Sequence, residues 1–126
     1  MSDPALAVQD AILAALTAAP VVAGGNVYDR VPPNAPTPYI AIGECVETNA
    51  DTACFESSEI AAQVHVWSTA PGMVEVKEIA AEVRTRCRTL VCEGLVEGRH
   101  VVTRYLRDPD GVTTHAVVEF EFFVDH

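Results

Sequence analysis

The chain has 126 residues, of which 49% are hydrophobic, and a formal net charge of −10 at pH 7. This length fits a single domain over residues 1–126, and the hydrophobic share is too high for a chain that is disordered throughout. The acidic balance, with no basic patch to offset it, argues against nonspecific binding to nucleic acid or to an anionic membrane.

The chain shows no targeting or membrane signal. No apolar run approaches the roughly 20 residues of a membrane span, and the start MSDPALAVQD lacks the basic region of a signal peptide. We therefore expect a soluble protein made inside the cell. In that reducing compartment the cysteines are expected to be free thiols; they are Cys45, Cys54, Cys87 and Cys92.

The first predicted element is a helix. Asp3 can cap it, Pro4 suits its first position because no N–H is needed there, and Pro20 ends it near Ala19. Its apolar residues fall roughly on one stripe: Leu6, Ala7, Ile12, Leu13 and Leu16.

Three strands follow. Gly24-Gly25 turns the chain into a short strand over 26–30, and 31–38, with four prolines, predicts an extended loop. Residues 39–46 predict a strand, and the polar stretch 47–56 predicts a loop or a strand extension. Residues 58–67 alternate, with Ile60, Ala62, Val64 and Val66 on one face and Gln63, His65 and Trp67 on the other.

A second helix is the most regular prediction. Ser68 or Thr69 can cap it, with Pro71 in its first turn, and Glu82 and Arg86 form a favourable i,i+4 pair. Its buried stripe is predicted from residues at helical spacing: Val76, Ile79, Ala80, Val83, Cys87, Leu90 and Val91.

The chain ends in a predicted hairpin. The turn 108–111, with Asp-Pro-Asp-Gly, is typical of a type I turn with glycine in the left-handed position. A three-residue loop pairs Asp108 with Val112, Leu106 with Thr114, and Val102 with Val118. The predicted core side of the last strand is Ala116, Val118, Phe120, Phe122 and Val124. Because Arg104 falls on that same side, the register stays open by one residue.

Together these elements predict an α+β fold, in one small domain without an internal repeat. Its sheet is mainly antiparallel, two α-helices pack on one face, and the order is α-β-β-β-α-β-β.

No motif predicts a metal or cofactor site. Cys87 and Cys92 are five residues apart, and the chain has neither a CxxC pair nor a second Cys/His pair at zinc spacing. Gly24-Gly25 precedes a strand rather than a helix, so it does not fit a phosphate-binding loop.

No residue is predicted to be catalytic. A nucleophile–base pair would join His65 to Cys45 or Cys54, yet no spacing supports either contact. Glu119 and Glu121 alternate with apolar residues, as on the outer face of a half-buried strand. The remaining histidines are scattered; they are His100, His115 and His126.

Several aromatic residues fall off the predicted core faces and are candidates for a partner surface. Phe55, Trp67 and Phe123 lie on the polar sides of their segments, and Tyr39 leads a strand directly after the proline-rich loop. Packing on a second face of the sheet is the competing interpretation for Trp67.

The succession of elements resembles the tail terminator, or tail-completion, family of long-tailed bacteriophages and gene transfer agents. The residues that carry the resemblance are AVQDAILAALTA, GGNVYDRVPPNAPTPYIAIGE, QVHVWSTAPGMVEVKEIAAEVR and YLRDPDGVTTHAVVEFEFFV. The acidic loop ETNADTACFESSE and the two helix cysteines depart from the pattern. The family has no catalytic residues to carry over.

The resemblance implies a structural protein that forms a ring, generally of six subunits, at the head-proximal end of the tail tube. Such a ring stops tube growth, contacts the tail tube protein and a neck or head-completion (stopper or adaptor) protein, and lets DNA pass through its lumen without specific binding. The protein would be made in the bacterial cytoplasm and end at the head–tail junction, with no membrane and no cofactor.

Two alternatives stay open. The first is another neck component, such as a head-completion or connector protein, which would also form a ring but would bind the portal side. A small cytosolic α+β enzyme or ligand-binding domain would instead use His65 and a nearby thiol.

Overall fold

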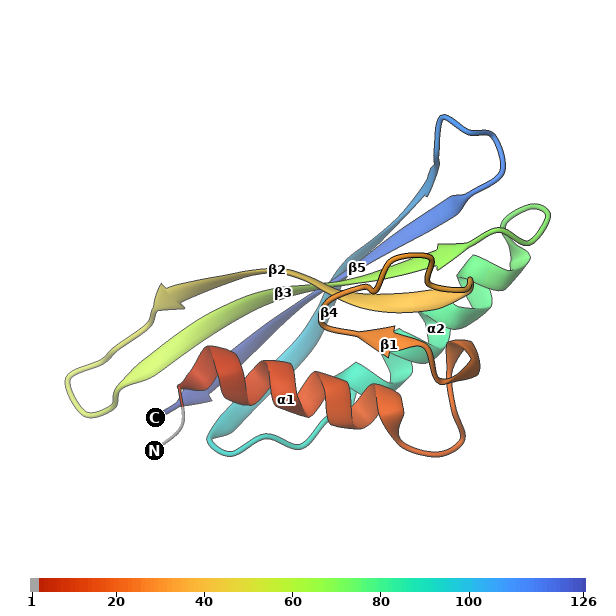
Figure 1. Cartoon of the computed structure of the whole chain (residues 1–126). Coiled ribbons are helices and arrows are strands. Elements are labelled where there is room, and N and C mark those ends of the chain that lie inside the picture. The colour runs from red at the N-terminus through yellow and green to blue at the C-terminus, as the bar shows by residue number, and fades with distance from the viewer. Residues whose placement is uncertain (1–2) are drawn as a thin grey trace.

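The computed structural model describes residues 3–126 and confirms the α+β fold and the predicted order of elements (Figure 1). Along the chain the elements are α1 (Pro4–Thr17), a 3-10 turn (Ala23–Gly25), β1 (Val27–Tyr28), β2 (Tyr39–Asn49), β3 (Ser57–Ser68), α2 (Val74–Arg88), β4 (Leu95–Arg107) and β5 (Thr114–Asp125).

The strands form one sheet in the order β1-β2-β3-β5-β4. β1 runs parallel to β2, and every other neighbouring pair is antiparallel. Both helices lie on one side of the sheet, and the β2–β3 and β4–β5 hairpins extend beyond them in opposite directions (Figure 1). We call the other side the bare face; its side chains include Glu59, Gln63, His65, Trp67, Arg99, Arg104, His115, Glu119 and Glu121.

The core lies between the helices and the two central strands. Alternation on β3 and β5 directs one set of side chains toward the helices, as predicted. Each large apolar side chain buried there contributes about 1.5–3 kcal/mol. The fully buried residues of these strands include Ile60, Val64, Val66, Val118, Phe120 and Phe122.

The predicted stripe of α1 is partly wrong. Ile12 and Leu16 are buried, but Leu6 is 52% exposed and Val8 is buried in its place. Residues at a spacing of four align on one helical face, and the face that meets the sheet is Pro4, Val8, Ile12 and Leu16.

α1 ends at Thr17, before the predicted Ala19, and a side chain from α2 caps it. The Arg86 guanidinium donates to the carbonyl oxygens of Ala18 at 2.7 Å, Ala15 at 3.2 Å and Pro20. These carbonyls have no partner within the helix, and a cation at a helix C-terminus is favoured by the helix dipole. Arg86 also forms the predicted ion pair with Glu82, at 2.9 Å.

The predicted ends of α2 are wrong by several residues. Ser68 belongs to β3, where it pairs with Thr114, and the helix begins at Val74. Ser68 still supports the helix start, because its hydroxyl donates to the Glu75 carboxylate at 2.7 Å. The helix ends at Arg88, so Leu90 is buried beyond it and Val91 is 91% exposed rather than part of the stripe.

β2 continues past the predicted strand 39–46 to Asn49. Of the two interpretations of 47–56, a strand extension is confirmed for 47–49, and residues 50–56 form the loop. A bulge between Ile42 and Cys45 shifts its pairing with β3 by one residue. β1 is only the pair Val27–Tyr28, shorter than the predicted 26–30.

The predicted hairpin register is wrong by one residue. Leu106 pairs with His115, and Val102 pairs with Glu119. The loop is longer than three residues because Asp110 accepts from the backbone N–H groups of Val112 at 2.9 Å and Thr113 at 2.8 Å. The shift moves Arg104 to the bare face and so removes the conflict that the predicted register left.

Candidate functional site

The structure brings together two of the four aromatic residues predicted to form a partner surface. Tyr39 pairs with Trp67 across β2 and β3, and their rings stack at a centroid distance of 6.3 Å. Phe55 is 63% exposed in the loop after β2. Phe123 lies on β5 opposite Glu59, near the other end of the sheet. The four residues therefore do not form one continuous patch.

Two histidines and a second tyrosine extend the Tyr39–Trp67 pair along the bare face. The His115 ring stacks on Trp67 at 3.6 Å between centroids, and its Nε2 lies 2.7 Å from Nδ1 of His65. Tyr28 contacts Tyr39 at 6.1 Å between centroids. We call these five residues the aromatic–histidine cluster. Alternation alone places His115 on the outer face, but only the pairing of β3 with β5 puts it beside Trp67.

Glycine at position 43 makes room for this cluster. Gly43 lies in the β2 bulge, and a Cβ there would come within 2.4 Å of the His65 ring. The close approach explains why a residue without a side chain occupies the bulge.

Burial and charge set the protonation of the two histidines. Burial lowers the pKa of His65, and Arg104 lowers it further, against the opposing effect of Glu44. Burial also lowers the pKa of His115, and His65 adds to this, against Asp108. Because one neutral ring must donate to the other across 2.7 Å, a doubly protonated pair would place two N–H groups against each other. Both effects favour the neutral form of the two rings.

We expect acidification to disturb the cluster only below the ordinary histidine pKa of about 6.5. Trp67 is the one tryptophan of the chain, and an imidazolium stacked on it quenches its emission. Fluorescence should therefore fall with a midpoint below about 6.5. His115→Gln should remove the transition and His126→Gln should keep it. A midpoint at or above the ordinary value would contradict the assigned environment.

The same pKa shifts determine whether acidification stabilises or destabilises the folded chain. The unfolded chain takes up protons at a higher pH than the folded cluster does, so the folded state binds fewer protons through this range. The stability associated with the neutral pair is therefore complete above about pH 6.5 and is lost as the pH falls below it.

The sheet separates His65 from the thiol that a nucleophilic pair would need. His65 lies on the bare face, whereas Cys45 lies on the helix side, opposite Ala62. Burial, followed by Glu47 and Asp3, raises the pKa of the Cys45 thiol, which disfavours the reactive thiolate. Cys54 lies in the exposed loop after β2.

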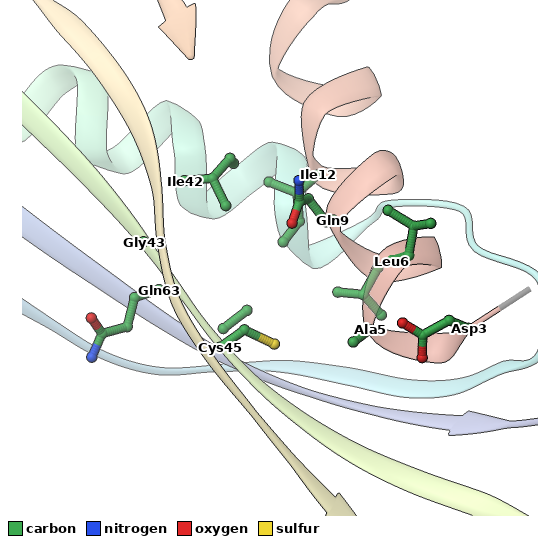
Figure 2. Close-up of a pocket in the computed structure, with 11 residues that line it drawn as sticks. Asp3, Ala5, Leu6, Gln9, Ile12, Ile42, Gly43, Cys45 and Gln63 are labelled. Atoms are coloured by element: carbon green, nitrogen blue, oxygen red, sulfur yellow. The ribbon is translucent and has the colours of Figure 1, made fainter. Parts of the chain in front are cut away.

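Cys45 lines a small cavity of about 230 Å³ between α1 and β2. Figure 2 shows its sulfur turned toward the start of α1, near Ala5, while the amide of Gln63 points away from the helix. The lining is mainly apolar, and the volume is below the 300–1,000 Å³ that is usual for ligand pockets. We read the cavity as a packing gap where the β2 bulge lifts the strand from α1.

The two outer carboxylates of β5 bind side chains of neighbouring strands. Glu119 accepts from Arg104 at 2.7 Å and from Gln63 at 3.0 Å, and Glu121 accepts from Arg99 at 3.0 Å. Among residues 3–126, no group of three or more His, Cys, Asp or Glu side chains is arranged to hold a metal ion. No helix within the same residues combines the length and apolar character that crossing a membrane requires.

Comparison with known proteins identifies the fold and the family. In a solved structure of the virion of a native gene transfer agent particle, one chain shares this fold with a TM-score of 0.85. The two sequences are 24% identical, and the match covers 100% of both chains. A comparison with curated proteins finds no match. Residues 10–125 match the family described as tail completion protein gp17. Because that match takes in nearly the whole chain and agrees with the resemblance of the sequence motifs, the chain belongs to the tail completion protein gp17 family.

Proposed function

We propose that the chain assembles with copies of itself into a ring, of six subunits, on the head-proximal end of a tail tube. There it ends tube polymerisation and joins the tail to a neck or head protein. It acts as a structural component and catalyses no reaction. The observation that carries the proposal is the family match over residues 10–125.

The shape of the chain supports contacts with two different partners. The β2–β3 loop lies beyond one end of the sheet and the β4–β5 loop beyond the other, clear of the helices between them (Figure 1). Projecting loops on a rigid scaffold are suited to binding. We assign one of these ends to the tail tube protein and the other to the neck protein.

Net charge supports passage of DNA without binding. Six copies at −10 each carry a formal total of 6 × (−10) = −60. An acidic lumen repels the phosphate backbone, so DNA passes without forming ion pairs with the ring.

Negative-stain microscopy and light scattering of the purified chain test this proposal. We expect a mass near six copies, ring-shaped particles, and rings at one end of added tail tubes. A monomer that ignores the tubes would contradict it. Binding only to a portal-adaptor protein would instead favour a neck ring on the head side, which is the alternative that shares the same architecture.

A further inference from the structure

We infer that the ring closes by strand addition: β4 of one copy lies antiparallel to residues 42–49 of β2 in the next copy. This inference rests on the proposed ring and names the surfaces that build it. In such a head-to-tail interface, two different edges of each copy meet, and repetition closes the ring.

Both edges of the sheet are open over long stretches. β4 is the outermost strand on one side, with 13 residues that pair only with β5. On the other side, β1 covers β2 only at Ile40 and Ala41. Within residues 3–126, the part of β2 from 42 to 49 has no strand on its outer side. Open edges of this length present unpaired backbone donors and acceptors to a further strand.

Apolar side chains are exposed along both edges. On β4, Val101 is 43% exposed, Val102 36% and Leu106 46%, and on β2 Val46 is 61% exposed. Monomeric proteins protect long edges with charges, bulges or covering segments. Both edges carry charged residues and a bulge, between His100 and Val102 in β4 and between Ile42 and Cys45 in β2. Even so, exposed valines lie beside an uncovered backbone on both edges.

The two edges carry opposite charge. β4 holds three arginines and one glutamate, a formal charge of +2, although the whole chain carries −10. Residues 42–49 of β2 hold two glutamates and no basic residue, a formal charge of −2. Like edges would repel, so this distribution favours β4 against β2 over β4 against β4.

The direction of the strands follows from the sheet order. β2 and β4 run in opposite directions within one copy, because three antiparallel steps separate them. Rotation about an axis roughly along the strands preserves these directions, so β4 meets the neighbouring β2 in the antiparallel sense.

In one register of β4 against the neighbouring β2, the facing residues agree in charge, in apolar character and in the side of the sheet on which they lie. It places Glu44 opposite Arg104, Cys45 opposite Thr103, and Val46 opposite Val102. Glu44 and Arg104 both lie on the bare face, where each influences His65. Cys45 and Thr103 both lie on the helix side, opposite Ala62 and Val118.

In the ring we place the helices outside and the bare face toward the lumen, because the bare face carries the outer carboxylates of the sheet. This orientation places Glu44, Glu59, Glu119 and Glu121 on the DNA side, with Arg99 and Arg104 already paired to two of them. It agrees with an acidic channel.

Disulfide trapping tests the pairing. In a chain with Cys54→Ser and Cys92→Ser, Thr103→Cys provides a thiol opposite Cys45 of the next copy, and facing residues of antiparallel strands lie within disulfide reach. Mild oxidation should convert most of the chain into a covalent ladder that ends at the ring size. Adding Cys45→Ser should abolish the ladder. Thr85→Cys, on the exposed side of α2, is the matched control and should give none.

Tyr105→Cys, on the same side of β4 as Thr103, probes the neighbouring register. A ladder from this position that depends on Cys45 supports strand addition with the register displaced by two residues. Rings in the microscope with no ladder from either position would overturn strand addition and leave the proposed ring intact. A covalent dimer from Thr103→Cys that forms without Cys45 would indicate β4 against β4 and would overturn the inference. Absence of rings from the parent chain would instead defeat the proposed function.

Discussion

Glu44→Arg is expected to abolish ring assembly, and Arg104→Glu in the same chain is expected to restore it in part, because Arg104 also pairs with Glu119 within the copy. The single change sets two arginines opposite each other at every interface. Opposed like charges on facing strands cost about 1–2 kcal/mol, and about 1.4 kcal/mol weakens association tenfold. Because closure repeats the same interface around the ring, the losses accumulate and the chain should sediment as a monomer.

The double reversal recreates an opposite-charge pair with its sign exchanged. Glu78→Arg provides the matched control, since it makes the same charge change on the exposed side of α2 and should leave the ring intact. Sedimentation velocity measures all three chains, and circular dichroism checks that each is folded. Rings formed by folded Glu44→Arg at the parent concentration would contradict the assigned register.

The sequence predicts a helix or strand best where its apolar residues recur at one regular spacing. α2 repeats apolar residues at helical spacing, and Val76, Ala80, Val83 and Cys87 are buried as predicted. β5 alternates except at Val117, which is buried on the bare face, and its whole predicted core side is buried. In both elements a single buried face determines the pattern, so local periodicity and tertiary packing agree.

Predictions failed where a few side-chain contacts decide the structure. The Asp110 carboxylate lengthens the hairpin loop and displaces the register by one residue, which turn residues alone do not reveal. α1 is rich in alanine, so its stripe is weakly marked and Leu6 was placed on the wrong side. Arg86 caps α1 from a distant part of the chain, and this contact is not visible in the local sequence.

The sequence predicted only part of the aromatic–histidine cluster, because the pairing of distant strands decides which residues meet there. Trp67 stands out in sequence as a large aromatic residue on a polar face, and the structure places Tyr39 beside it. His115 and Tyr28 were missed because they reach the cluster through pairing between strands distant in sequence. The open edges were equally hidden, since strand order is a property of the assembled sheet.

The largest effect expected in a particle-producing cell is on tail length. A tube without its terminating ring continues to add subunits, because nothing occupies the surface on which the next tube ring docks. Loss of the chain should therefore broaden and lengthen the tails and leave them unjoined to heads, and supply of the parent chain should restore both properties. Glu44→Arg should fail to restore them, whereas the control Glu78→Arg should succeed.

Tail length in purified particles, measured by electron microscopy with and without this chain, is the most direct test of a role that depends on shape rather than chemistry. The account predicts long, headless tails in its absence. Tails of normal length joined to heads in cells that lack the chain would contradict it.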